Sequence, residues 1–157
     1  MANISINTNP TGRSPDKTFF FGKQTKYLDL QRPKYNKIGK EKNYNEFLKL
    51  LKNQNYVSPM NFETVGTNFT LYTNDERHKQ FVWNMFKVTA EDQVGDWTIY
   101  HNTEIEMEPK IFIHLEDKRL LIGGTTFVGE IKKDVVGIVS FELTKYKILQ
   151  MHCGAVK

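Results

Sequence analysis

The second half of the chain alternates between short apolar segments and charged turns, and this spacing constrains the fold most. Each segment is long enough for a strand and shorter than an average helix. The intervening turns include Glu116-Asp117-Lys118 and Lys132-Lys133-Asp134. Short strands joined in this way are typical of an antiparallel meander. The strands expected from this pattern are 97–101, 104–107, 111–115, 119–122, 126–131, 135–143 and 146–153.

The segment 135–143 carries apolar side chains on both strand faces, which indicates that both of its faces are covered. We therefore expect a second sheet or a helix above it. Residues 80–88 fit a helix or a strand, and their β-branched and aromatic content favours a strand. The expected fold class is α+β, mainly β, with an antiparallel meander or sandwich over about 66–153.

One amphipathic helix is expected over 43–54. Asn43 is a good N-cap residue, and Glu46 follows three positions later, as in a capping box. The buried stripe of this helix consists of Tyr44, Phe47, Leu48 and Leu51.

Charge is distributed unevenly along the 157 residues. Residues 1–53 contain 11 Lys or Arg and 4 Asp or Glu, a net charge of +7, whereas 54–157 contain 11 and 14, a net charge of −3. Together with Pro10, Pro15 and Pro33, this predicts an extended basic and aromatic arm over 1–42. A single compact β-rich domain is expected over 43–157.

The arm combines aromatic anchors with cations. Phe19, Phe20 and Phe21 are expected to anchor the arm onto a protein surface. A basic segment with interspersed aromatic residues suits single-stranded nucleic acid or an acidic protein surface. The cations expected to contact an anionic partner are Lys23, Lys26, Arg32, Lys34, Lys37 and Lys40.

An acidic surface that could receive this arm is present in the same chain. Glu104, Glu106 and Glu108 alternate along an expected strand, so they share one face. The arm of this molecule or of a neighbouring copy could lie against them.

A divalent-metal nuclease is one alternative, with Asp96, Glu108 and Lys110 as its residues. A hairpin turning at Asn102-Thr103 would place Asp96 beside the other two, where two carboxylates hold a metal ion and the lysine orients water. Pro109 counts against this arrangement because it would interrupt the ladder of a central strand.

Other patterns give no catalytic site, metal site or cofactor. His101-Asn102-Thr103 matches half of a two-histidine phosphoesterase pattern, but His114-Leu115-Glu116 fails the other half. Adjacent strand residues point to opposite faces, which separates His152 from Cys153. Gly123-Gly124-Thr125-Thr126 lacks the lysine of a phosphate-binding loop and is expected to form a bend.

The single cysteine excludes an intrachain disulfide and favours a reducing compartment. No signal-peptide core and no membrane-length apolar run is present, so an intracellular location or a viral particle is expected.

These features predict a non-enzymatic structural or assembly subunit that docks through its N-terminal arm, for example in a virus or phage particle. Its expected partners are other protein subunits, of the same or different chains, and nucleic acid, but no membrane. A nucleic-acid-binding module is the first alternative and the metal nuclease is the second.

Overall fold

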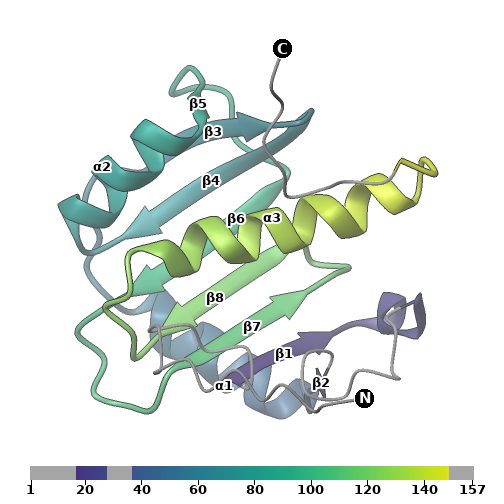
Figure 1. Cartoon of the computed structure of the whole chain (residues 1–157). Coiled ribbons are helices and arrows are strands. Elements are labelled where there is room, and N and C mark those ends of the chain that lie inside the picture. The colour runs from purple at the N-terminus through teal and green to yellow at the C-terminus, as the bar shows by residue number, and fades with distance from the viewer. Residues whose placement is uncertain (1–16, 28–36, 149–157) are drawn as a thin grey trace, which may run out of the picture.

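The computed structural model describes residues 17–27 and 37–148, which form one sheet flanked by helices (Figure 1). Among these residues, no helix is both long and apolar enough to cross a membrane. The helices are α1 (Glu41–Lys52), α2 (Glu76–Met85), α3 (Gly129–Thr144) and the short 3-10 helix η2 (Lys23–Tyr27). The strands are β1 (Thr18–Phe21), β2 (Lys37–Ile38), β3 (Met60–Thr64), β4 (Thr67–Thr73), β5 (Lys87–Val88), β6 (Trp97–Asn102), β7 (Lys110–His114) and β8 (Arg119–Gly123).

The sheet is mixed rather than antiparallel. Within the described residues its order is β2-β1-β7-β8-β6-β4-β3-β5. The central strands β8, β6 and β4 are parallel to one another. Strand β7 is antiparallel to β8, and β3 is antiparallel to β4. A mixed sheet with helices is compatible with an α+β fold rich in strands, but the expectation of an antiparallel meander or sandwich is wrong.

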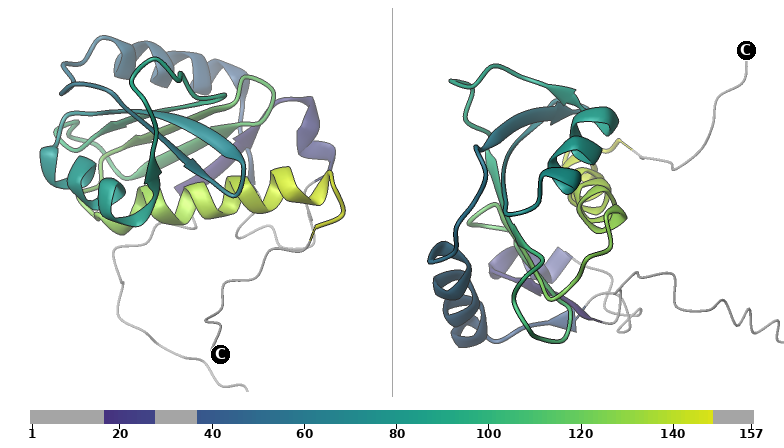
Figure 2. Two further views of the ribbon diagram at one scale, coloured as in Figure 1. Left: turned by 90° about the horizontal axis from the view of Figure 1, so that it is seen from above. Right: turned by 90° about the vertical axis from the view of Figure 1, so that its left-hand side faces the viewer.

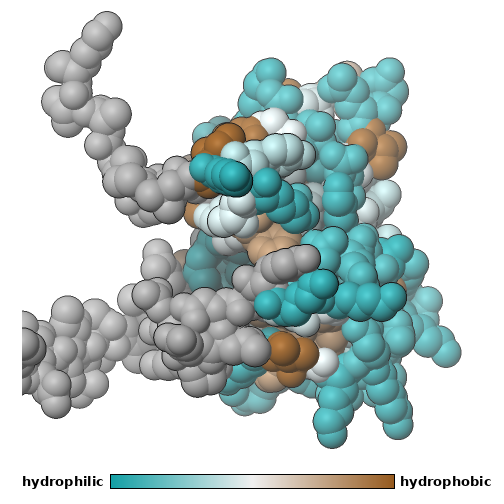
Figure 3. Space-filling view, turned by 90° about the vertical axis from the view of Figure 1, so that its right-hand side faces the viewer, coloured by the Kyte–Doolittle hydropathy of each residue, from teal (hydrophilic) through white to brown (hydrophobic). Residues whose placement is uncertain are grey.

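Helices cover both faces of the sheet. Helix α1 lies on one face, while α2 and α3 lie on the other, as the side view in Figure 2 shows. The sheet is therefore the middle of three layers, and strands β7 and β8 bury apolar side chains on both of their sides. On the side seen in Figure 3, the coloured surface is largely hydrophilic, with hydrophobic residues in small separate patches.

Each face of the sheet has its own hydrophobic core. On the α1 face, Tyr44, Phe47 and Leu51 of the helix belong to one buried cluster with Phe112 and Leu121 of the sheet. The larger cluster, on the face of α2 and α3, includes Ile99, Ile111, Leu120, Ile122, Val82, Ile131, Val135, Ile138 and Val139. Burying a side chain of this size stabilises the fold by about 1.5–3 kcal/mol.

Two predicted local elements are present. The helix expected over 43–54 is α1, and its stripe residues Tyr44, Phe47 and Leu51 are buried. It begins two residues earlier than expected, after Lys40, so Asn43 is not its N-cap. The hairpin through Glu116-Asp117-Lys118 is also present, since β7 and β8 pair antiparallel on either side of it.

Two strand predictions are wrong because the segments form helices. Residues 80–88 lie mostly in α2, which begins after Asp75. The expected strands 126–131 and 135–143 are replaced by the single helix α3, which contains residues 129–131 of the first segment and all of the second. Its buried residues include Ile131, Val135, Ile138 and Val139, whose spacing of four, three and one residues marks one helix face.

The expected hairpin around Asn102-Thr103 is absent from the described sheet, because β8 lies between β6 and β7. Residues 104–107 form a connection rather than a strand. Residues 145–148 follow α3 without forming a strand, and the rest of the segment expected over 146–153 lies outside the described residues.

Strands β1 and β2 come from the segment expected to be an arm. β1 pairs in parallel with both β2 and β7, so these residues extend the sheet of the main body. The division of the chain at residue 42 stays a prediction.

Two glycine substitutions should have opposite effects on stability. A Cβ at Gly95 would lie 2.3 Å from the carbonyl carbon of Phe69, so Gly95→Ala should lower the free energy of unfolding by about 1–3 kcal/mol. A Cβ at Gly137, within α3, would meet no atom within 4 Å, so Gly137→Ala should raise it by about 0.5–1 kcal/mol. Urea unfolding of both variants measures these changes, and equal effects would contradict this packing.

Candidate anion-binding site

The carboxyl ends of the three central strands lie at one edge of the sheet. β4 ends at Thr73, β6 at Asn102 and β8 at Gly123. Helices α2 and α3 both begin at this edge, shortly after β4 and β8 (Figure 1). In open α/β sheets, ligands bind outside the carboxyl ends of parallel strands, and helix N-termini carry partial positive charge there.

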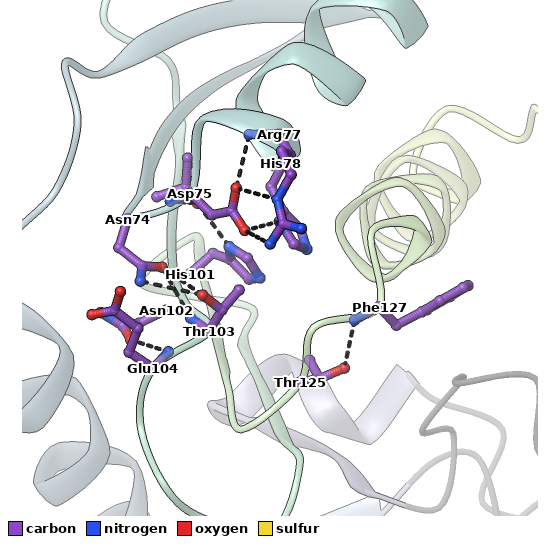
Figure 4. Close-up of polar contacts among 11 residues, drawn as sticks. Asn74, Asp75, Arg77, His78, His101, Asn102, Thr103, Glu104, Thr125 and Phe127 are labelled. Carbon is purple, nitrogen blue, oxygen red and sulfur yellow. Dashed lines mark hydrogen bonds and ion pairs between the residues drawn. The ribbon is translucent and has the colours of Figure 1, made fainter.

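Amide side chains fix the loops that leave β4 and β6. The Asn74 side chain accepts a hydrogen bond from the Thr103 backbone N–H at 2.9 Å and donates one to the Thr103 hydroxyl at 3.2 Å. Asn102 accepts from the backbone N–H of Glu104 at 2.8 Å, forming an Asx turn that ends β6 (Figure 4). The two loops are thereby held together.

Asp75 holds the beginning of α2. Its carboxylate accepts from the Arg77 backbone N–H at 2.8 Å and from Arg77 Nη2 at 2.7 Å. Hydrogen bonding from the Arg77 side chain lowers the pKa of Asp75 well below its usual range. His78 Nδ1 lies 3.2 Å from Oδ2 of the same carboxylate, the oxygen that also accepts from Arg77 Nη2.

A pair of buried histidines lies beneath this edge. The rings of His78 and His101 have centroids 4.5 Å apart, and both residues are almost fully buried. Thr73 Oγ1 is 2.8 Å from His101 Nδ1. Burial lowers the pKa of His101 to about 3 and also lowers that of His78, so both rings are neutral near pH 7.

The loop after β8 approaches the backbone of the loop before β7 closely. Gly124 has a φ of +73°, and a Cβ there would lie 2.4 Å from the carbonyl oxygen of Met107. Only glycine can adopt this positive φ and also leave room for the Met107 carbonyl oxygen without strain. Thr125 Oγ1 then accepts from the Phe127 N–H at 3.2 Å, which sets the path of the chain into α3.

A hollow of about 520 Å³ opens between α2 and the beginning of α3. Lys132 and Lys133 line it together with aromatic and aliphatic groups. Its other lining residues are Phe81, Phe127, Val128, Gly129 and Val136. Two cations beside a helix N-terminus, in a partly apolar hollow, form a suitable environment for a small anion.

The residues predicted as an arm anchor lie within the sheet, in β1. Phe21 is buried and its ring centroid is 4.9 Å from that of Phe112. Phe19 and Phe20 are half-buried. The structure therefore places the three phenylalanines against this domain itself.

The predicted cations that the structure describes lie on η2, on β2 and directly before α1. Lys23 and Lys26 are exposed on η2, while Lys40 is exposed directly before α1. Lys37 Nζ lies 5.6 Å from the centroid of the Phe19 ring. Arg32 and Lys34 lie outside the described residues. Contact of these cations with nucleic acid or another subunit stays a prediction.

The predicted acidic strand face is not on a strand. Glu104, Glu106 and Glu108 are exposed in the connection between β6 and β7, because the Asx turn at Asn102 ends β6 before them. Lys17 Nζ is 4.0 Å from Glu108 Oε2. That these three glutamates bind the basic arm of another copy stays a prediction.

The structure separates the residues of the predicted nuclease site. Lys110 begins β7 beside Gly123, at the edge where β6 ends, whereas Asp96 precedes the other end of β6. A six-residue strand spans roughly 17–20 Å, which is too far for a shared metal ion. Among the described residues, no three His, Cys, Asp or Glu side chains are grouped to hold a metal.

The sequence patterns missed the lysines of the hollow. The spacing of the sequence places Lys132 and Lys133 in a hairpin turn, and His101 fits only half of a phosphoesterase motif. The signal that could have revealed them is the order of elements along the chain. Strand β8 is followed within a few residues by the glycine bend and then by α3, whose first turns contain both lysines.

Comparison with known proteins decides the family. The model of the phosphoenolpyruvate carboxykinase family matches residues 2–157. The chain belongs to this family. Its match with the phosphoenolpyruvate carboxykinase (ATP) of Deinococcus radiodurans has 24% identity over 175 positions and covers 97% of this chain and 37% of the relative. The enzymes of the same name from Lysinibacillus sphaericus and Geobacter metallireducens are each 34% identical over 91 and 92 positions, covering 50% of this chain and 17% of theirs.

This membership corrects the functional prediction. The family is one of enzymes, so the expected non-enzymatic structural or assembly subunit of a virus or phage particle is wrong. The two alternatives, a nucleic-acid-binding module and a metal nuclease, do not agree with this family either. The chain spans well under half the length of these curated relatives.

The buried histidines should make the fold sensitive to acid. An unfolded His101 gains a proton near pH 6.5, whereas the folded ring resists protonation down to about pH 3. The unfolded state therefore binds more protons in this interval, and stability should fall as the pH falls from 6.5 towards 3. The lowered pKa of Asp75 adds a further loss of stability at still lower pH, where its carboxylate becomes protonated.

His101→Asn should reduce this acid sensitivity, because asparagine does not titrate. We expect the variant to be less stable at pH 7 but to lose less stability than the wild type between pH 7 and 4.5. Urea unfolding at the two pH values measures the difference. An equal loss in both proteins would contradict the buried neutral state of His101.

Proposed function

We propose that this chain contributes part of the substrate-binding wall of an ATP-dependent phosphoenolpyruvate carboxykinase. The observation that supports this most directly is the hollow beside the N-terminus of α3, with Lys132 and Lys133 in its lining. We infer the substrate from family membership, because the names of the relatives contain phosphoenolpyruvate and ATP.

Phosphoenolpyruvate suits this hollow in its charge and in its apolar carbon unit. It carries a carboxylate and a phosphate on a three-carbon unit. The side chains of Lys132 and Lys133 provide positive charge, and the partial charge at the beginning of α3 has the same sign. Phe81, Phe127 and Val136 provide an apolar wall against which the enol carbons would pack.

The role of these groups is to bind and orient the anion. Phosphoryl transfer depends chiefly on positioning and on stabilisation of negative charge, which are the two contributions that fixed lysines and a helix N-terminus provide. The chain has no Gly-Lys-Ser/Thr phosphate-binding loop. We therefore assign phosphoenolpyruvate, rather than the triphosphate of ATP, to this hollow. An intracellular location is part of this proposal.

Binding of phosphoenolpyruvate to the chain tests the proposal. Two charge-assisted contacts of about 1.5–3 kcal/mol each correspond to a dissociation constant of the order of 1 mM. In an NMR titration, the signals of Phe127, Lys132 and Lys133 should shift together, and affinity should fall as salt is added.

Lys132→Gln should weaken this binding about tenfold, since it removes one charged contact worth at least ~1.4 kcal/mol. Lys49→Gln is the matched control, because Lys49 is exposed on α1, on the opposite face of the sheet. Shifts confined to other regions, or equal affinity in Lys132→Gln and the wild type, would refute this assignment.

A further inference from the structure

A second hollow, of about 690 Å³, lies at the opposite end of α3 from the candidate site. Residues of η2, of the β7–β8 turn and of the end of α3 line it, and these three segments lie on the right-hand side of Figure 1. We call it the η2 hollow. α3 has 16 residues, so its two ends are roughly 24 Å apart and the two hollows are separate.

Hydrogen bonds fix η2, which forms one wall of this hollow, to the sheet. The chain turns into η2 at Gly22, which has a φ of +92°. The Gly22 carbonyl accepts from the Thr25 backbone N–H at 3.1 Å and from the Thr25 hydroxyl at 2.8 Å. The Leu115 N–H donates to the Phe21 carbonyl at 3.1 Å, which joins this turn to the end of β7. The wall is therefore in place before a ligand arrives.

The side chains that line the η2 hollow carry a positive net charge. Lys23 and Lys26 on η2 and Lys145 after α3 line it with one carboxylate, that of Glu116, so three positive charges and one negative charge give +2. Lys23 and Lys26 are among the cations that the sequence predicts to contact an anionic partner. Their place at a hollow favours a small anion, because a concave site encloses a ligand of limited size.

Two contacts hold Lys145 at the wall. Its Nζ donates to Glu142 Oε2 at 2.8 Å and lies 5.0 Å from the centroid of the Phe141 ring, which also lines the hollow. An ammonium group has three N–H donors, so the bond to Glu142 leaves capacity for a ligand. Glu142 does not line the hollow, and counting its carboxylate as well lowers the net charge from +2 to +1, which is still positive.

The end of α3 opposes an anion only weakly. A helix carboxyl end carries about half an elementary negative charge, on carbonyl groups that lack partners. Here the Leu143 carbonyl accepts from the N–H groups of Tyr146 and Ile148 at 3.0 Å and 3.1 Å. The Thr144 carbonyl accepts from the Lys147 N–H at 3.0 Å. These bonds satisfy the last carbonyl groups, and the lysine charges outweigh the remainder.

Gln24 provides a hydrogen-bond acceptor in the same hollow. Its Oε1 is buried and has no hydrogen-bond partner among the residues that the structure describes. A buried polar atom without a partner is unfavourable, so a ligand with an N–H or O–H group is favoured there. Small-molecule sites usually measure about 300–1,000 Å³, and the η2 hollow lies in this range. It therefore suits a ligand larger than inorganic phosphate.

We propose that the η2 hollow binds a nucleoside monophosphate. Its phosphate contacts the ammonium groups of Lys23, Lys26 and Lys145, which suit the two negative charges of a phosphate monoester. Its base lies against the Phe141 ring and donates an N–H group to Gln24 Oε1. The proposal is independent of the proposed function, which concerns the other end of α3.

An NMR titration of the chain with adenosine monophosphate (AMP) tests the proposal. The signals of the Gln24 side-chain amide, Phe141 and Lys145 should shift together. Adenosine and inorganic phosphate should each bind at least about tenfold more weakly, because one lacks the charge and the other lacks the base. Shifts confined to Phe127 and Lys132 would place AMP in the hollow at the beginning of α3 and would overturn the proposal.

Charge variants separate a built site from general attraction. Lys23→Gln should weaken AMP binding about fivefold, whereas Lys49→Gln, on α1, should leave it unchanged. Glu116→Gln should strengthen binding about threefold because it removes a negative charge from the wall, whereas Glu106→Gln, between β6 and β7, should not. Equal effects of each variant and its control would indicate attraction to net charge alone and would overturn the proposal.

Gln24→Leu tests the hydrogen bond to the base separately. This variant should bind AMP about fivefold more weakly, while its affinity for inorganic phosphate should stay unchanged. Equal AMP affinity in this variant and the wild type would overturn the assigned class of ligand. A single-stranded oligonucleotide that shifts the same signals at a lower concentration than AMP would also overturn it, in favour of nucleic acid.

Discussion

The parallel pairing of β4, β6 and β8 is the constraint on which the rest of the structure depends. It places three strand ends at one edge, and the chain returns from β4 to β6 through α2 and from β6 to β8 through the antiparallel strand β7. α2 follows β4 and α3 follows β8, so two helices begin at the edge where the strands end. The histidine pair, the glycine bend and the lysine-lined hollow all owe their proximity to this pairing.

Local patterns in the sequence predicted local structure well. The stripe of Tyr44, Phe47 and Leu51 indicated α1 because an amphipathic helix at a surface has one clear apolar face. The β7–β8 hairpin could also be predicted from the sequence, since its two strands are adjacent both along the chain and in the sheet. These elements depend on neighbouring residues alone.

The failures come from burial and from pairing between distant segments. α3 contains many β-branched residues and lies against the sheet, so its pattern of apolar residues resembled that of a strand covered on both faces. Nothing near Asn102 reveals that β8 will insert between β6 and β7. The lysines of the hollow were missed for the same reason, because they line a site only if residues 129–144 form a helix.

The position of β1 affects how this domain can be made. Thr18 pairs with Ile111, 93 positions later, so a strand from the beginning of the chain depends on one that a ribosome completes much later. Until residue 114 has left the ribosome, Phe19, Phe20 and Phe21 lack their place beside β7. Contacts of such long sequence separation slow folding and leave apolar segments exposed in the meantime. Phe19, Phe20 and Phe21 therefore stay without their final neighbours while most of this segment is synthesised.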